Sequence, residues 1–121
     1  MTPSEIIQAD AKTRGYEADP VLRKISKVVK TGAGILLQEG NSVLLLIALP
    51  DNNAELHLYT ADKSPLAIYK AVTGFVKKIR ESDLNAVYGS GDIPDLLEML
   101  KKLGVDVQPS DLPGYKWMAP V

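Results

Sequence analysis

Three side chains capable of acid–base chemistry alternate along one short segment, Glu55-Leu56-His57-Leu58-Tyr59. In a strand, successive side chains point to opposite faces, so Glu55, His57 and Tyr59 would share one face. Histidine changes charge near neutral pH and can take a proton from an amine, directly or through water. The spacing therefore predicts a general base, His57 or Glu55, with Tyr59 beside it. The alternative is that His57, the one histidine of the chain, is a hydrogen-bonded structural residue.

The elements around this segment must position it. The sequence predicts a strand over Glu55–Thr60, a polar turn, and a long helix over Pro65–Glu81. A second strand over Leu84–Tyr88 and a second helix over Asp92–Leu103, ended by Gly104, follow. Strands that alternate with helices of this length predict right-handed crossovers and locally parallel strands.

The run Val43–Leu49 is apolar at nearly every position, which predicts a strand covered on both faces. The polar turn Glu39–Ser42 before it predicts a hairpin. The expected fold is therefore a single α/β (α+β) domain over 1–121, with a mixed central sheet of about five to seven strands and helices on both faces. Its expected parts are N-terminal helices in 1–31, antiparallel strands in 33–60, a helix–strand–helix segment in 65–104 and C-terminal strands in 105–118.

Helical periodicity predicts the core. One stripe of the long helix should face the sheet, and four leucines of the second helix should be buried nearby. These residues are Leu66, Tyr69, Val72, Phe75 and Ile79, and then Leu96, Leu97, Leu100 and Leu103. Short strands are expected at Val105–Val107 and Tyr115–Met118.

Composition excludes several classes of function. Without cysteine there is no disulfide, thiolate metal site or cysteine nucleophile, and with one histidine no spacing suggests any other metal site. The net charge of −1 argues against a nucleic-acid protein. Four cations on one predicted helix are interpreted as a solvated face, with an anion-binding face as the alternative: Arg23, Lys24, Lys27 and Lys30. No segment predicts a signal peptide or a membrane span, so we expect a soluble cytoplasmic protein and no membrane partner.

The order helix, helix, hairpin, strand, long helix, strand, helix-Gly, strand, strand resembles the Gcn5-related N-acetyltransferase (GNAT) fold, over roughly Ala18–Met118. Its most specific parts are the strand Glu55–Thr60 running into the long helix and the helix end Leu100–Val105. The family's first strand is missing, or Thr2–Lys12 replaces it. The compact form is similar to acetyltransferase-like proteins of bacteriophages, including internal virion proteins. This likeness implies a location in the host cytoplasm or the virion.

The resemblance also implies where a cofactor would bind. In the family, a glycine-rich strand-to-helix turn wraps the pyrophosphate of acyl-CoA with main-chain amides. The corresponding turn here, Thr60–Pro65, has no glycine and carries Asp62. If acetyl-CoA binds, the residues implied to contact it are Tyr59, Thr60, Lys63 and Ser64. The tyrosine with which family members protonate the departing thiolate would fall at Leu100, which cannot donate a proton.

Two main hypotheses follow. The one favoured by the sequence is a GNAT-fold protein with a degenerate acyl-CoA site, acting without catalysis and without a cofactor as an assembly or binding module, through a protein partner or self-assembly. The other is an active acetyl-CoA-dependent N-acetyltransferase acting on an amine, with His57 or Glu55 as base. A nucleic-acid-associated protein ranks third. Because the turn lacks the glycine-rich amide donors of the family, we predict that acetyl-CoA binds no tighter than about 100 μM.

Overall fold

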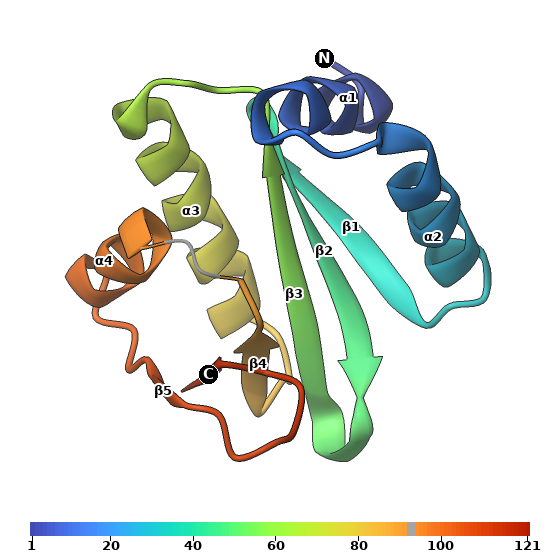
Figure 1. Cartoon of the computed structure of the whole chain (residues 1–121). Helices are drawn as coiled ribbons and strands as arrows, with labels where there is room; N and C mark the ends of the chain where they lie inside the picture. Colours follow the sequence, from blue (N-terminus) through green and yellow to red (C-terminus); the bar gives the residue numbers. More distant parts are fainter. Residues whose placement is uncertain (92–93) are drawn as a thin grey trace.

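A mixed sheet lies between two pairs of helices (Figure 1). The computed structural model describes residues 1–91 and 94–121. Over these residues the helices are α1 (Pro3–Arg14), α2 (Ala18–Lys30), α3 (Pro65–Arg80) and α4 (Pro94–Lys102). The strands are β1 (Gly34–Glu39), β2 (Ser42–Leu49), β3 (Asn53–Thr60), β4 (Ala86–Gly89), β5 (Gln108–Pro109) and β6 (Trp117–Pro120), and a 3-10 turn spans Pro50–Asn52.

The strands follow the order β1-β2-β3-β4-β6-β5. Neighbouring strands are antiparallel except β3 and β4, which are parallel and joined through α3. The prediction of a mixed sheet with helices on both faces is therefore confirmed. The strand that carries Glu55 and His57 lies in the middle of the sheet and runs into the long helix, as its sequence indicated.

The two faces of β2 pack against different helices, because its side chains are apolar on both sides. Val43 and Leu45 contact the isoleucines of α1 and α2, while Leu44 and Leu46 contact α3. On α3, Phe75 is buried against the sheet. Two apolar layers therefore hold the sheet in place, and β3 lies between them.

The parallel pair β3–β4 is short. Only Ala54 and Glu55 of β3 pair with β4, opposite Val87 and Tyr88. Figure 1 shows β4 beside the first part of β3 alone, while β3 continues toward α1. At Gly89 the chain needs glycine, because a Cβ there would lie 2.4 Å from the indole of Trp117. The early separation of the two strands opens a cleft between them.

Three expectations about the elements are wrong. Leu66 does not face the sheet but is 65% exposed, because the first turn of α3 lies past the end of β3 (Figure 1). Val105 and Val107 form no strand; their side chains pack against the core, and β5 follows at Gln108–Pro109. The last strand, β6, begins at Trp117 rather than Tyr115.

Two further expectations concern the ends of elements. The segment Thr2–Lys12 lies in α1 and its cap, and Thr2 caps that helix in a capping box with Glu5. The predicted start of the second helix at Asp92 lies outside the described residues, and α4 is assigned from Pro94.

Candidate acid–base site

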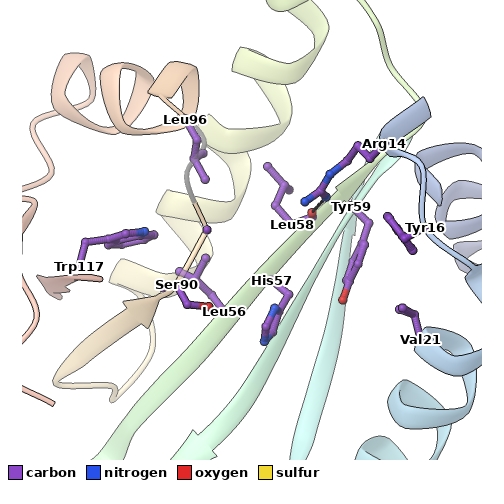
Figure 2. A pocket seen from close by; sticks show the side chains of 12 residues that line it. Arg14, Tyr16, Val21, Leu56, His57, Leu58, Tyr59, Ser90, Leu96 and Trp117 are labelled. Carbon is purple, nitrogen blue, oxygen red and sulfur yellow. Dashed lines mark hydrogen bonds between the residues drawn. The ribbon is translucent and has the colours of Figure 1, made fainter. Parts of the chain in front are cut away.

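A cavity of about 320 Å³ opens where β3 leaves β4. Figure 2 shows His57 and Tyr59 on one side of β3, and Leu56 and Leu58 on the other. The residues lining the cavity come from α1, the loop after it, α2, β3, the end of β4 and the turn that follows, α4 and β6. They are Arg14, Tyr16, Val21, Leu56, His57, Leu58, Tyr59, Gly89, Ser90, Gly91, Leu96 and Trp117.

His57 and Glu55 form a direct contact beside this cavity. The Nε2 atom of His57 meets Oε2 of Glu55, and the hydroxyl of Tyr115 donates a hydrogen bond of 2.6 Å to Oε1. Tyr115 comes from the loop before β6, and its ring lies 5.6 Å from the ring of Tyr88. The side chains of His57 and Glu55 are 30% and 19% exposed, so the pair is partly buried but still reachable from the cleft.

The ionisation of Glu55 determines which nitrogen of His57 is free. Burial tends to raise the pKa of Glu55, but the hydrogen bonds from Tyr115 and His57 outweigh it and lower the pKa below the usual value. At neutral pH the carboxylate is therefore ionised and can only accept hydrogen bonds. In the neutral imidazole Nε2 must then carry the proton that is donated to Glu55, and Nδ1 is the nitrogen with the lone pair of a base.

Tyr115 is the hydrogen-bond donor at the Glu55 end of the series Tyr115–Glu55–His57. Its hydrogen bond to Glu55, reinforced by burial, raises its pKa to about 12. The phenol therefore stays protonated at neutral pH and fixes the Glu55 carboxylate from the side opposite His57. The Tyr88 hydroxyl donates in turn to Oδ1 of Asp111 at 2.8 Å, which anchors the loop that carries Tyr115. The loop between β5 and β6 and the strands β3 and β4 thus position one histidine.

Tyr59 shares the face of His57, as the alternation predicted, but has a different role. It lies against the isoleucine cluster of α1 and α2, and burial raises its pKa. A phenol held in the protonated form can line the cleft but is a poor base. The structure therefore brings Glu55 and His57 together and places Tyr59 in the wall of the cleft.

A second polar cluster attaches α1 to the separated part of β3. The carboxylate of Asp10 is 2% exposed and accepts three hydrogen bonds: from Arg14 at 3.1 Å, from the Tyr16 hydroxyl at 2.5 Å and from the main-chain N–H of Thr60 at 3.2 Å. Burial and the bond to Asp10 raise the pKa of Tyr16. Arg14 also donates to the carbonyl of Leu58 at 3.3 Å, the dashed line in Figure 2.

Sequence reasoning missed this cluster. Its one local signal is that Asp10 falls on the helix face of Ile6 and Ile7, where a carboxylate is out of place unless it is paired. The cluster satisfies main-chain groups of β3 just where β4 no longer reaches them. It therefore keeps the cleft open without leaving buried polar groups unpaired.

In the turn Thr60–Pro65, the hydroxyl groups of Thr60 and Ser64 form hydrogen bonds within the fold. The Thr60 hydroxyl accepts from Ser42 at 2.8 Å and from the main-chain N–H of Asp62 at 3.0 Å. The Ser64 hydroxyl accepts from the N–H of Ala67 at 3.4 Å and so caps α3. The exposed Lys63 lines a second cavity of about 590 Å³ between α1, α3 and α4.

The residues expected to bind a cofactor therefore do not meet at one point. Tyr59 lines the first cavity, whereas Thr60 and Lys63 line the second. The two cavities share Arg14, Leu58 and Leu96, so they adjoin one another along β3. Leu100 is buried in the core below and offers no proton donor.

In residues 1–91 and 94–121 no three acidic or histidine side chains are grouped so that they could hold a metal ion. Within the same residues, no helix has the length and apolar character needed to span a bilayer. Protein-family models, curated proteins and solved structures were each compared with this chain, and none of them matches it.

Proposed function

We propose that the cleft is an acid–base site for transfer of an acyl group from a thioester to an amine, with His57 as the general base. One observation carries the proposal: the Tyr115–Glu55–His57 chain holds His57 through Nε2, and His57 lines an open cavity. A histidine oriented by a carboxylate is a common arrangement for proton transfer. The resemblance to the acetyltransferase fold supplies the choice of donor.

In this reaction His57 takes a proton from the amine as its nitrogen attacks the acyl carbonyl. The C–N bond forms, the C–S bond breaks, and the thiolate leaves with a proton from the imidazolium or from water. Glu55 stabilises the positive charge that His57 acquires, because it is already ionised and in contact with Nε2. Leu56 and Leu58 provide an apolar wall for the pantetheine side of the donor.

The experiment is a thiol-release assay with acetyl-CoA and a series of primary amines, including spermidine and a lysine peptide. Changing His57→Gln should lower the rate by about 100-fold or more, the usual contribution of a general base. Tyr59→Phe is the matched control, because it changes a neighbour on the same face and should leave the rate within a few-fold of wild type. A His57→Gln rate equal to wild type would exclude His57 as the base.

A second candidate is a non-catalytic binding or assembly module with a degenerate acyl-CoA site. It is favoured by the turn Thr60–Pro65, whose Ser64 hydroxyl caps α3 and whose backbone has no glycine. Losing two charge-assisted hydrogen bonds weakens binding by about 3–6 kcal/mol, or two to four decades. On this candidate, calorimetric titration detects no acetyl-CoA binding tighter than about 100 μM. Low-micromolar binding that disappears in Lys63→Ala would rule it out.

A further inference from the structure

The strand β1 forms one edge of the sheet, because it pairs with β2 alone. The main-chain N–H of Ala48 donates to the carbonyl of Ala33 at 2.8 Å, so odd-numbered residues of this segment turn their main-chain groups toward β2. By alternation, the N–H and C=O groups of Gly34, Leu36 and Gln38 point outward. The Gln38 carbonyl does so and accepts from Lys78 at 3.4 Å.

The two edges of the sheet are protected very differently. The opposite edge, β5, has two residues, Gln108 and Pro109, and proline offers no N–H to a further strand. The β1 edge runs through Gly34–Leu37 without a charge or a proline. Soluble proteins usually block a sheet edge with charges, prolines or bulges. The β1 edge has none of these over Gly34–Leu37.

Apolar side chains accompany the outward main-chain groups. Ile35 is 55% exposed. It lies on the same strand face as Leu37, which packs against the α3 side of the core. A groove of about 400 Å³ begins beside Ile35 and continues over Leu46 and Ala54. A charged pair, Lys78 and Glu39, lies beside the Gln38 end of β1, with Nζ and Oε1 2.8 Å apart, and Lys78 also lines the groove.

We propose that β1 pairs with β1 of a second copy of this chain, antiparallel and across a two-fold axis at Leu36, so that two sheets become one. The partner must be a strand, because the open groups are the main-chain donors and acceptors of a strand. In this register Leu36 lies opposite itself and Gly34 lies opposite Gln38, so outward groups meet outward groups once the Gln38 carbonyl exchanges its 3.4 Å bond from Lys78 for one from the partner strand. Ile35 then lies opposite Leu37 on the same face, and each covers the other.

Self-pairing fits this edge because the same strand satisfies both sides of an isologous contact. The net charge of −1 gives little repulsion between two copies. The axis lies on the far side of β2 from the cleft, since β3 and β4 come after β2 in the sheet. The pairing therefore leaves the acid–base site accessible. The proposed dimer does not depend on the proposed reaction.

The experiment is sedimentation velocity of the full chain from low micromolar to submillimolar concentration, for wild type and two variants. Ile35→Lys places a charge on the edge at a side chain that is already exposed. Leu66→Lys is the matched control, because Leu66 is a similarly exposed apolar residue on α3, away from β1. We expect wild type and Leu66→Lys to reach the mass of a dimer and Ile35→Lys to weaken dimerisation at least tenfold.

Hydrogen exchange of the wild-type chain gives a second reading that does not depend on any variant folding. The amides of Gly34, Leu36 and Gln38 should become more protected as protein concentration rises, while those of β5 should not change. A wild-type chain that stays monomeric at all concentrations would overturn the proposal. So would a dimer retained by folded Ile35→Lys, or outward amides whose exchange is independent of concentration.

Discussion

The two faces of β3 differ in what they contact. One face, with Ala54, Leu56 and Leu58, packs against α3 and α4. The other carries Glu55 and His57, and Glu55 accepts a hydrogen bond from Tyr115 of the loop before β6. One strand therefore joins the core to the candidate chemistry. Changes on the apolar side should mainly lower stability, and changes around Glu55 and His57 should mainly alter reactivity.

The largest expected effect is on the apolar side. Phe75 is 3% exposed and contacts the sheet beneath β3, so Phe75→Ala should lower the free energy of unfolding by about 3–5 kcal/mol. Denaturant unfolding measures this loss. Leu66→Ala on the same helix is the control and should change stability by no more than about 0.5 kcal/mol. A loss below about 1 kcal/mol in Phe75→Ala would show that this face does not dominate stability.

The next largest effect is expected at Asp10, a polar residue whose role is structural. Asp10→Ala removes a buried carboxylate and leaves the N–H of Thr60 and the hydroxyl of Tyr16 without their acceptor. We expect a loss of about 2–4 kcal/mol in the free energy of unfolding. The exposed Asp19→Ala serves as the control. Equal stabilities of the two variants would mean that the cluster does not anchor α1.

Within the acid–base chain the expected effect on stability is smaller. Tyr115→Phe removes a single hydrogen bond and should lower the free energy of unfolding by about 0.5–1.5 kcal/mol. The folded-state pKa of Tyr115, about 12, lies above its unfolded value, so its stabilisation is complete below the unfolded pKa and disappears as pH rises through 12. In an ultraviolet titration, Tyr115→Phe should therefore show one fewer tyrosine that ionises near pH 12 than wild type.

The smallest expected effect lies at acid pH. The pKa of folded Glu55 is below its unfolded value, so the unfolded chain binds more protons as pH falls. Its stabilisation is present above the unfolded pKa and is lost as pH falls through the folded pKa. The free energy of unfolding of wild type should therefore decline more steeply between neutral pH and acid pH than that of Glu55→Gln. Parallel curves for the two proteins would contradict the lowered pKa.

Local pattern was sufficient to predict β3, α3 and the hairpin of β1 and β2, because strand alternation and helical periodicity are properties of neighbouring residues. It also placed Glu55 and His57 on one face. It could not supply Tyr115, which reaches Glu55 from 60 positions away, or the burial of Asp10 under Thr60. Both depend on how the elements pack.

The proposal of catalysis also depends on how the elements pack. The sequence favoured a non-catalytic module, because the turn Thr60–Pro65 lacks glycine and Leu100 lacks a hydroxyl. Neither of these sequence features says how the side chain of His57 is oriented. Once Glu55 and Tyr115 are seen to fix that side chain, the balance between the two hypotheses moves toward catalysis. The turn still argues for weak binding of acetyl-CoA. The thiol-release assay and the calorimetric titration therefore test different properties.

Gly89 and Trp117 together give the cleft its own optical signal. Trp117 is the one tryptophan of the chain, and its indole lines the cavity because Gly89 has no side chain to displace it. Indole emission responds to the polarity of its surroundings. A molecule that enters between β3 and β4 and alters the polarity around the indole should therefore change the fluorescence of this one residue. Occupancy of the cleft can be followed in the unlabelled protein, even for a ligand that undergoes no reaction there.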